Sequence, residues 1–326
     1  MAGVGDAQLR DGAALLRVTD LEVDYPTKEG VVRAVSGVSF DVLRGETVGL
    51  VGESGCGKST TGRAILRLPA PSRGSVHFDG VEVTALSFER MRELRGRLQM
   101  IFQDPISSLN PRRRVRDIVA EGLVIRGGGG RAEVAERVAK ALDDVGLDPA
   151  TAGSRRPSEF SGGQCQRICI ARVLVLEPEL IVCDEPVSAL DVSVQAQILN
   201  LLASVKASYG LSLLFISHDL SVVRHICDRV VVMYLGRVCE VGPTERVFQR
   251  PAHPYTRLLM ESVPGAAADR PPGDRAKAEL PSVLAPPSGC YFRTRCPLAV
   301  DRCATETPVT REVAPGQYVA CHLAEA

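Results

Sequence analysis

The clearest chemistry in the sequence follows the apolar run at residues 47–51 (TVGLV). Residues 52–59, GESGCGKS, match the pattern G-x-x-x-x-G-K-[ST], in which glycines let backbone N–H groups surround phosphate oxygens. Lys58 would neutralise the β and γ oxygens of a nucleotide, and Ser59 would hold Mg²⁺. Because an apolar run precedes this loop and a helical pattern (TGRAILRL) follows it, the sequence predicts a phosphate-binding loop between a strand and a helix.

A pair of carboxylates follows a second apolar run. Residues 180–183 (LIVC) lead directly into Asp184 and Glu185, which places both acids at the end of a buried strand. In a protein with a phosphate-binding loop, the first acid would bind Mg²⁺ through water and the second would orient the attacking water. An acidic pair after a strand is commonly only solvated. The functional interpretation of this pair is favoured because a phosphate-binding loop needs carboxylates for Mg²⁺ and for the attacking water.

Ten cysteines divide into two groups. Six are scattered over the first 240 residues, and four fall within the last 37 with the spacing C-x5-C-x6-C-x17-C, namely Cys290, Cys296, Cys303 and Cys321. Four thiolates suit either a tetrahedral zinc ion or a four-iron cluster, and free thiols are the plain alternative. The spacing by itself slightly favours zinc. A segment this short cannot bury an adequate hydrophobic core alone, so stabilisation by a bound metal or cluster is physically reasonable.

The elements that must position these residues follow from the apolar periodicity. Residues 17–48 alternate apolar and polar positions around turns, which predicts an antiparallel β region. Residues 180–183 and 213–216 are short apolar runs separated by a helical pattern, and such alternation predicts a parallel sheet covered by helices. Residues 112–150 form a charged helical stretch interrupted by the tetraglycine at 127–130. The expected fold class is therefore α/β with a helical insertion.

Composition excludes several classes of protein. The chain has 326 residues and a mass of 34.9 kDa, with 45% apolar and 24% charged residues, which rules out disordered and collagen-like chains. Because 39 basic residues balance 39 acidic ones, the chain has no net positive charge that would attract nucleic acid. We therefore expect no nucleic-acid partner. No apolar stretch approaches a membrane span, and the N-terminus carries an acidic residue where a signal peptide has basic ones. We therefore expect a soluble, cytoplasmic chain.

Further motifs complete a set that is typical of one family. Residues 160–164 (FSGGQ), 188–191 (SALD) and 217–219 (SHD) follow in this order, and Gln103 lies in IFQDP. With the phosphate-binding loop and the acidic pair, this set resembles the ATP-binding subunits of ABC transporters, where the equivalents are the signature motif, the D-loop, the switch histidine and the Q-loop. The segments DPISSLNPRRRV and HPYTRLLMESVP and the cysteine tail are similar to the oligopeptide and dipeptide importer branch.

The resemblance implies a fold and domain boundaries. The fold is a P-loop NTPase of the ABC cassette type, which is an α/β fold with a mixed sheet core, an antiparallel β region and a helical insertion, followed by a small cysteine-rich C-terminal module. The implied divisions are an N-terminal tail at 1–16, a nucleotide-binding domain at 17–250 with its insertion at about 104–160, a proline-rich linker at 251–288 and the cysteine-rich module at 289–326.

The resemblance also implies roles at the nucleotide site. Glu185 would be the catalytic base or would position the attacking water, His218 would contact the γ-phosphate, and Asp191 would couple two subunits at their interface. Mg²⁺ would be held by Ser59, Gln103 and Asp184. The signature residues that would act on the ATP of a partner subunit are Ser161, Gly162, Gly163 and Gln164. The residues implied to bind ATP in this subunit, with the first stacking on adenine, are Tyr25, Gly52, Glu53, Ser54, Gly55, Cys56, Gly57, Lys58, Ser59, Thr60, Gln103 and Asp184.

Cys56 lies inside the phosphate-binding loop, at a position that contributes mainly backbone. A free thiol there can be alkylated. We therefore expect a thiol reagent to block ATPase activity unless ATP is present.

The function implied by the resemblance is ATP hydrolysis that powers a bacterial importer of oligopeptides or dipeptides. Its partners would be a second ATP-binding subunit, identical or homologous, two transmembrane permeases and an extracellular solute-binding protein. The chain would lie at the cytoplasmic face of the cell membrane, held by the permeases. The branch resemblance also shifts the expectation for the four tail cysteines from zinc to a [4Fe-4S] cluster. Two alternatives remain, a soluble ABC ATPase outside transport and an importer of another solute such as nickel.

Overall fold

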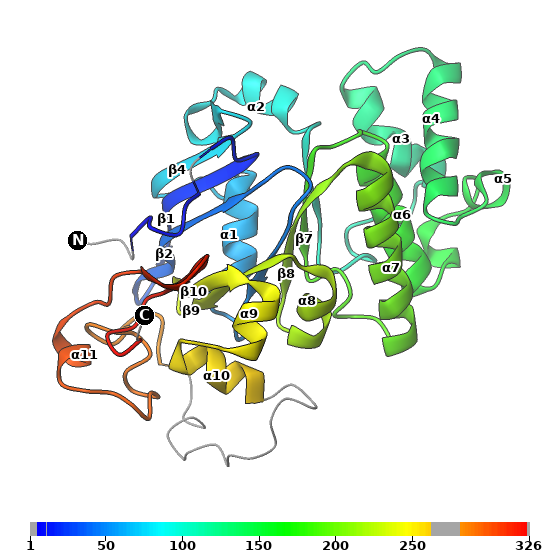
Figure 1. Cartoon of the computed structure of the whole chain (residues 1–326). Coiled ribbons are helices and arrows are strands. Elements are labelled where there is room, and N and C mark those ends of the chain that lie inside the picture. The colour runs from blue at the N-terminus through cyan, green and yellow to red at the C-terminus, as the bar shows by residue number, and fades with distance from the viewer. Residues whose placement is uncertain (1–4, 11, 262–280, 325–326) are drawn as a thin grey trace. The chain divides into compact units, whose positions relative to one another are not determined.

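The computed structural model describes residues 5–10, 12–261 and 281–324, and the chain divides into two compact units. Unit 1 combines Met1–Ala85 with Phe215–Ala326, and unit 2 is Leu86–Leu214. Strand β8 (Ser212–Ser217) crosses the boundary between the two units. Figure 1 labels the elements of both units along the chain. Within the described ranges, no helix is both long enough and apolar enough to cross a bilayer.

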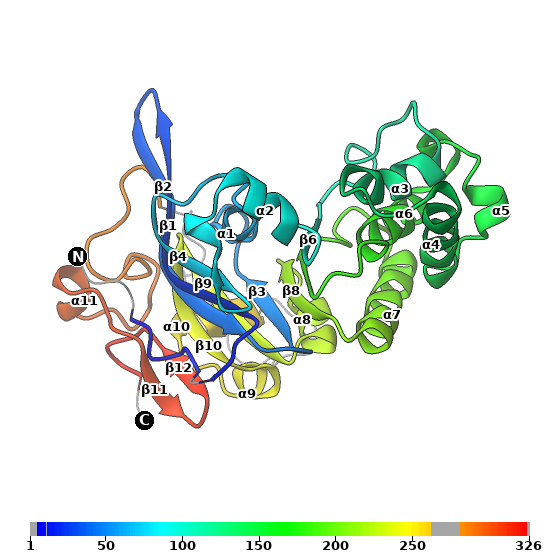
Figure 2. The same cartoon turned by 90° about the horizontal axis from the view of Figure 1, so that it is seen from above.

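A four-stranded antiparallel sheet opens unit 1. Its strands β1 and β2 form a hairpin in which Thr27 lies opposite Gly30, and this hairpin extends beyond the rest of the sheet in Figure 2. Along β1, the side chains of Leu16 and Val18 are fully buried, as the alternating pattern requires. A register irregularity after Val18 shifts the alternation by one residue, so that Leu21 is the next fully buried side chain. The antiparallel region predicted at 17–48 is confirmed. The strand order is β2-β1-β4-β5, with bounds β1 Leu16–Thr27, β2 Gly30–Val42, β4 Arg73–Phe78 and β5 Val81–Glu82.

A second sheet in unit 1 positions the phosphate-binding loop. Strand β3 (Thr47–Val51) is buried along its whole length and runs parallel to β9 (Arg229–Tyr234). Strand β9 forms a hairpin with β10 (Arg237–Pro243). On the other side of β10 lies β12 (Gln317–Val319), which pairs with β11 (Arg311–Ala314). The strand predicted from TVGLV is therefore confirmed, and the chain leaves it directly into the loop.

Short helices flank the sheets of unit 1. Helix α1, which follows the phosphate-binding loop, contacts β1 and β2, whereas α8 contacts β3 and α9 contacts β9 and β10. The bounds are α1 Lys58–Ile65, α8 Leu220–Ile226, α9 Thr244–Gln249, α10 Pro254–Glu261 and α11 Arg302–Thr305, with a 3-10 turn η1 at Val83–Ala85.

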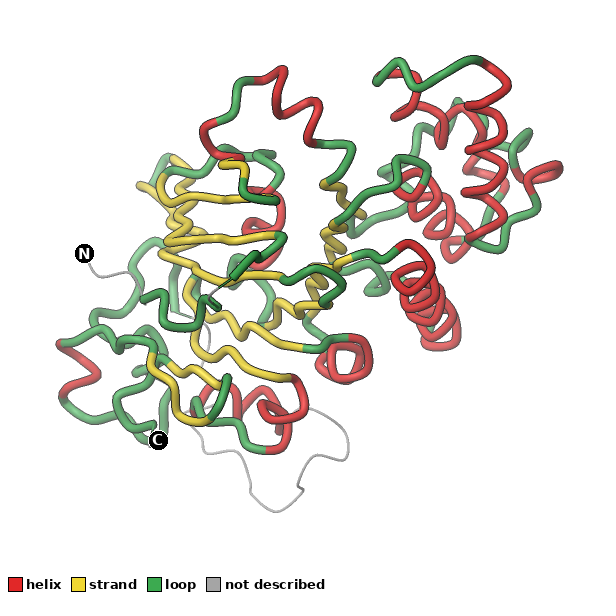
Figure 3. The backbone as a smooth tube through the Cα atoms, turned by 45° about the horizontal axis from the view of Figure 1, so that its top comes forward, coloured by secondary structure: helices red, strands yellow, loops and turns green. Residues whose placement is uncertain are grey.

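Unit 2 is mostly helical, as Figure 3 shows in red. Its strands β6 and β7 are parallel, and helix α6 contacts α3, α4, α7 and β6. The tetraglycine at 127–130 separates α3 from α4. The bounds are α2 Phe88–Leu94, β6 Leu98–Ile101, α3 Val115–Ile125, α4 Arg131–Asp144, α5 Pro149–Ala152, η2 Pro157–Glu159, α6 Gly162–Leu174, β7 Leu180–Asp184 and α7 Val192–Tyr209.

The C-terminal region differs from the expected linker and separate module. Within the expected linker at 251–288, Pro254–Glu261 form helix α10, whereas 262–280 lie outside the described residues. Beyond them, β12 joins the second sheet through β10, and the ring of Phe292 packs on Tyr234 and Tyr255. The physical reason is that so short a segment has too few apolar residues for a core of its own. It therefore pairs its backbone with β10 and buries the ring of Phe292 against the rest of unit 1.

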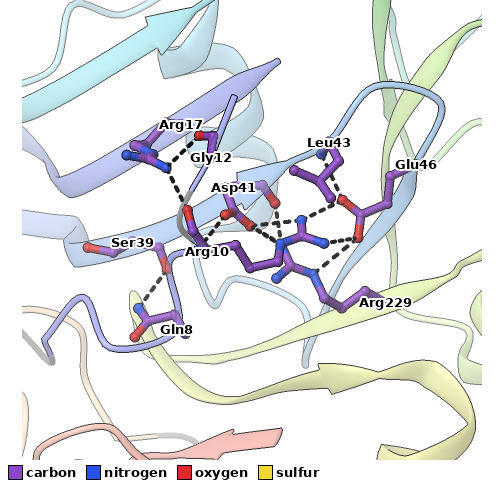
Figure 4. A network of polar contacts seen from close by, with 9 residues as sticks. All are labelled: Gln8, Arg10, Gly12, Arg17, Ser39, Asp41, Leu43, Glu46 and Arg229. Atoms are coloured by element: carbon purple, nitrogen blue, oxygen red, sulfur yellow. Dashed lines mark hydrogen bonds and ion pairs between the residues drawn. The ribbon is translucent and has the colours of Figure 1, made fainter. Parts of the chain in front are cut away.

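A buried network of charges anchors the expected N-terminal tail to unit 1, as Figure 4 shows. The carboxylate of Asp41, which is fully buried, forms ion pairs with Arg229 and with Arg10, the latter at 2.9 Å. The carboxylate of Glu46 forms ion pairs with the same two arginines, at 2.6 Å to Arg10 and 3.3 Å to Arg229. Burial alone would raise the pKa of Asp41, but hydrogen bonds from Arg10 and the charge of Arg229 lower it below its ordinary value. Residues 5–10 are thus fixed to β2 and β9.

Candidate nucleotide site

Two glycines of the phosphate-binding loop are required by close backbone approaches. Gly52 has a φ of 151°, and a Cβ atom there would lie 2.2 Å from the carbonyl oxygen of Met233. Gly57 has a φ of 100°, and a Cβ atom there would lie 2.3 Å from the carbonyl oxygen of Ala34. A side chain at either position would be strained and would clash. The loop is therefore fixed against β2 and β9.

The ammonium group of Lys58 lies against this loop. The residue is 4% exposed, and its Nζ donates to the carbonyl oxygens of Gly52 at 2.8 Å and Glu53 at 2.9 Å. Because Lys58 is also the first residue of α1, its charge adds to the positive end of the helix dipole. The loop, the lysine and the helix terminus together form a site for a phosphate chain.

The thiol of Cys56 is covered by the loop and its surroundings. The residue is 1% exposed, and its Sγ lies 3.8 Å from Nζ of Lys58. Burial raises the pKa of this thiol, although the charge of Lys58 opposes the change. A covered thiol with a raised pKa is a poor nucleophile at neutral pH. We therefore expect alkylation of Cys56 to be slow in the folded chain, and block of ATPase activity by a thiol reagent, with protection by ATP, stays a prediction.

The other expected site residues of unit 1 lie in the loop, in helix α1, on strand β1 and directly after strand β8. Ser54 and Gly55 are exposed in the loop, and Ser59 and Thr60 are half-buried in the first turn of α1. Tyr25 lies on β1 with 39% of its surface exposed. His218 is exposed and follows β8 directly, one residue before Asp219 caps α8 by accepting from the backbone N–H groups of Ser221 and Val222.

Unit 2 brings the expected catalytic residue Glu185 together with Gln103, which was expected to bind ATP and Mg²⁺. Asp184 is fully buried at the end of β7, and Glu185 follows it with a φ of 47°. A left-handed backbone is strained for a residue other than glycine, and such strain gathers at functional sites. The amide Nε2 of Gln103, two residues beyond β6, donates to Oε2 of Glu185 at 3.1 Å. The adjacent parallel strands β6 and β7 thus deliver the glutamine to the carboxylate.

The signature motif forms the start of α6. Ser161 caps the helix, and its Oγ accepts from the backbone N–H of Gln164 at 3.4 Å. In return, Oε1 of Gln164 accepts from the backbone N–H of Ser161 at 3.0 Å, which completes a capping box. This reciprocal pair fixes the helix terminus, where the positive end of the dipole favours an anion. The D-loop residue Asp191 is exposed and occupies the same capping position at the start of α7.

The packing behind the signature motif was not predicted from the sequence. A Cβ atom on Gly163 would lie 2.5 Å from Cγ1 of Val194, on helix α7. Gly163 is thus a point of close approach between α6 and α7 as well as a residue of the motif. Only the tertiary packing identifies Val194 as its neighbour.

The four cysteines of the C-terminal tail do not form a recognisable metal centre. Over the ranges that the structure describes, no group of three or more His, Cys, Asp or Glu side chains is arranged to hold a metal ion. In the metal-free chain, burial raises the pKa of Cys290 to about 11 and also raises that of Cys296. In this arrangement the residues do not fit the iron–sulfur cluster or the zinc ion that we expected.

One contact of the phosphate-binding loop comes from an unexpected part of the chain. Arg295, in the cysteine tail, forms two hydrogen bonds with the carboxylate of Glu53, at 2.7 and 2.9 Å. Tyr255, on α10, accepts from the backbone N–H of Glu53 at 2.9 Å. The first pair is separated by 242 residues in the sequence, so no local pattern could have indicated it.

The fold and the loop define a class of protein. A glycine-rich loop with its lysine lies between strand β3 and helix α1, and an acidic pair ends strand β7. A capped SGGQ helix follows a helical insertion. This is the architecture of an ATPase built on an ATP-binding cassette.

Comparison with known proteins agrees with this class. The family model described as ABC transporter matches residues 35–188, and the model described as oligopeptide/dipeptide transporter, C-terminal region, matches residues 239–303. A putative peptide import ATP-binding protein of Brucella ovis is 53% identical over 94% of this chain and 97% of its own. The oligopeptide transport ATP-binding protein OppF of Salmonella typhimurium is 48% identical over 93% of this chain and 95% of its own.

Solved structures share the cassette. The cbiO1 subunit of Clostridium perfringens, part of the ABC transporter complex cbiONQ, matches with a TM-score of 0.65 and 30% identity over 73% of this chain and 92% of its own. A dimeric ATP-binding cassette in a post-hydrolysis state with ADP and Pi matches with a TM-score of 0.64 and 28% identity over 70% of this chain and 98% of its own. The chain belongs to the family of ABC transporter ATP-binding proteins, in the branch that carries the oligopeptide/dipeptide transporter C-terminal region.

Proposed function

We propose that this chain is the ATP-hydrolysing subunit that powers a bacterial importer of oligopeptides or dipeptides. It acts at the cytoplasmic face of the membrane together with a second ATP-binding subunit, two permeases and an extracellular solute-binding protein. The names of the relatives, peptide import and oligopeptide transport ATP-binding proteins, support the solute class. The match of residues 239–303 to the C-terminal region of such transporters supports the same assignment.

The observation that carries the catalytic part of this proposal is the hydrogen bond between Gln103 and Glu185. Glu185 accepts a proton from the attacking water, whose oxygen bonds to the γ-phosphorus while the bond to the bridging oxygen of ADP breaks. Gln103 orients the carboxylate for this step, and His218 contacts the γ-phosphate. Ser59, Gln103 and Asp184 would hold Mg²⁺, which would supply charge neutralisation on the phosphates.

Dimerisation completes the site in this proposal. The start of α6 offers backbone N–H groups at a capped terminus, which would contact the γ-phosphate of ATP held by the partner subunit's phosphate-binding loop. Contacts that exist only while the γ-phosphate is present would favour the closed pair. Hydrolysis then removes those contacts and lets the pair open, and Asp191 couples the two sites at the interface.

The role of Glu185 is tested with Glu185→Gln. We expect turnover of ATP to fall about 100-fold or more, whereas binding of a fluorescent ATP analogue is kept and ATP traps the closed dimer. The matched control is Glu89→Gln, an exposed carboxylate at the start of α2, which should leave turnover unchanged. Continued turnover by Glu185→Gln would refute the role of Glu185.

The transport function is tested in vesicles that contain the full complex purified from membranes. Peptide-loaded binding protein should stimulate ATP hydrolysis and uptake of the peptide. Stimulation by a nickel-loaded binding protein instead would show that the importer carries another solute. A fully cytosolic chain that copurifies with no permease would refute the importer and favour an ABC ATPase outside transport.

The metal content of the cysteine tail is a separate question that the proposal does not depend on. Iron, acid-labile sulfide and zinc are measured in protein purified without oxygen, beside a variant with serine at positions 290, 296, 303 and 321. Near four iron and four sulfide per chain, lost in the variant, would establish the [4Fe-4S] cluster expected from the branch resemblance. One zinc would establish the alternative site, and no metal would agree with the described arrangement of these cysteines.

A further inference from the structure

Glu53 is held at all three of its polar groups. Its carboxylate accepts two parallel hydrogen bonds from the guanidinium of Arg295, at 2.7 and 2.9 Å. Its backbone N–H donates to the hydroxyl of Tyr255 at 2.9 Å, and its carbonyl oxygen accepts from Nζ of Lys58 at 2.9 Å. Glu53 is the second residue of the phosphate-binding loop. The loop is thus linked through one residue to its own lysine and to the C-terminal region.

The two C-terminal partners of Glu53 belong to one aromatic layer. Tyr255 is fully buried, and its ring centroid lies 4.7 Å from that of Tyr234 and 5.4 Å from that of Phe292. The guanidinium of Arg295, which is 5% exposed, lies 5.7 Å from the ring centroid of Tyr234 and 5.9 Å from that of Phe292. Rings packed at tilted and edge-on angles, with a cation beside them, restrict each other's positions.

This layer is fixed to the sheet that carries the loop. Glu240, which lies on β10 and is fully buried, accepts from the backbone N–H groups of Ala252 at 3.0 Å and His253 at 2.9 Å. Gln317, on β12, donates to the same carboxylate at 2.7 Å. The segment before Tyr255 and the strand of the tail therefore share one buried anchor, and the aromatic layer cannot shift freely.

The charge at Glu53 explains why an arginine is needed. A carboxylate beside a site for phosphate oxygens repels them unless a cation neutralises it. The planar guanidinium satisfies both carboxylate oxygens at once and holds them in a fixed orientation. Because Arg295 is buried and the side chain of Glu53 is only 26% exposed, removing one partner leaves a charge that solvent compensates only in part. Loss of Arg295 would therefore both loosen the loop and expose its nucleotide to a negative charge.

We propose that Arg295 and Tyr255 are positioning residues for ATP binding, through which the C-terminal region holds the phosphate-binding loop in the conformation that receives the nucleotide. The C-terminal region is thus part of the ATP site of this chain. Arg295 fixes and neutralises the side chain of Glu53, and Tyr255 fixes its backbone N–H. Neither residue contacts the reacting atoms.

The test uses the full chain and measures the Kd of a fluorescent ATP analogue together with kcat and KM for ATP. Arg295→Gln should raise Kd and KM by about tenfold, within the usual range of coupling between sites, with a smaller change in kcat. Arg295→Lys, which keeps the charge without the planar fork, should recover part of the affinity. Tyr255→Phe should also raise KM. The matched control is Arg302→Gln, which breaks the exposed pair of Arg302 and Glu306 in the same tail and should change neither constant.

A double-variant cycle separates positioning from general stability. Glu53→Gln removes the charge that Arg295 neutralises, so the double variant Glu53→Gln with Arg295→Gln should bind the ATP analogue more tightly than Arg295→Gln alone. Thermal denaturation of each variant shows whether the chain is folded. If the double variant binds no better than Arg295→Gln, or if Arg295→Gln lowers the Tm while leaving Kd unchanged, the proposal is overturned. If Arg295→Gln does not fold, the test passes to Arg295→Lys and Tyr255→Phe. Each of these variants should raise KM for ATP by a larger factor than it lowers kcat. If neither does so, the proposal is overturned.

The inference rests on ATP binding at the loop and not on the transported solute. Its measurements need no permease, binding protein or peptide. A failure here would leave the transport proposal intact, and a different solute would leave the role of Arg295 intact.

Discussion

A Cβ atom added to Gly163 would lie 2.5 Å from Cγ1 of Val194, so the glycine of the signature motif is also a contact point between helices α6 and α7. Contacts this short force a neighbouring side chain or a helix to move. The glycine therefore has a packing role that is separate from any role at the nucleotide.

This packing role predicts the effect of Gly163→Ala. The added methyl should lower the free energy of unfolding by about 1–3 kcal/mol, as overpacking does. The double variant Gly163→Ala with Val194→Ala makes room for the methyl and should recover part of that loss. Urea denaturation of the three variants measures it. If Gly163→Ala is as stable as the parent chain, the close contact with Val194 is contradicted. If the double variant is stable but its ATPase activity stays low, Gly163 also has a role at the nucleotide.

A second prediction concerns the reactivity of Cys56. Because the thiol is 1% exposed and burial raises its pKa, alkylation should be slow at pH 7 and should accelerate as the pH rises. Mass spectrometry of the peptide that contains Cys56 measures the rate, with urea-unfolded protein as the reference for an accessible thiol. Equal rates in the folded and unfolded protein would contradict the burial. Protection by ATP, expected from the sequence, is measured in the same series.

A third prediction concerns the buried pair of Asp41 and Arg229. Asp41→Asn leaves the buried Arg229 and the partly exposed Arg10 with Glu46 as their one remaining carboxylate in this network, and it should cost about 3–5 kcal/mol of unfolding free energy. The control, Asp24→Asn, breaks a partly exposed pair with Arg33 and should cost at most about 1 kcal/mol. Chemical denaturation compares the two variants. Similar losses in both would show that the network in Figure 4 contributes no more than a surface ion pair.

The same network predicts a dependence on acid. The pKa of Asp41 is lower in the folded chain than in the unfolded chain, where it is about 3.9. The carboxylate therefore contributes its full stabilisation above the unfolded pKa. This stabilisation is lost as the pH falls through the lower pKa of the folded chain. Denaturation curves between pH 5 and pH 3 should show this loss in the parent chain. The Asp41→Asn variant should lose less stability over this pH range than the parent chain. If its stability falls with pH as steeply as that of the parent chain, the acid dependence comes from other groups.

A further prediction concerns His253. Burial lowers the pKa of its imidazole to about 3, although a hydrogen bond with the backbone of Ala320 acts in the opposite direction. Its Nδ1 accepts from the backbone N–H of Tyr255 at 3.0 Å, so the neutral ring is required. Below the unfolded pKa of about 6.5 the unfolded chain binds a proton that the folded chain does not, and stability should fall by up to about 1.4 kcal/mol per pH unit. In denaturation curves at pH 7, 6 and 5, His253→Asn should lack this slope.

The local features of the site could be predicted from the sequence because neighbouring residues determine them. The apolar run before GESGCGKS gives β3, the pattern after it gives α1, and LIVC before Asp184 gives β7. Ser161 and Gln164 lie three residues apart, so their capping box also depends on adjacent sequence alone. Such features are short in range, and their hydrogen bonds close within a few residues.

The sequence by itself determined the order of the nucleotide motifs, the class of fold and the branch of the family. Only the tertiary structure decided that β12 joins β10, that Cys56 is covered and that Arg295 reaches Glu53 across 242 residues. The periodicity of a sequence tells which face of an element is buried but not which distant element covers it. That choice depends on the packing of whole segments, whose partners are fixed by shape and charge when the chain folds.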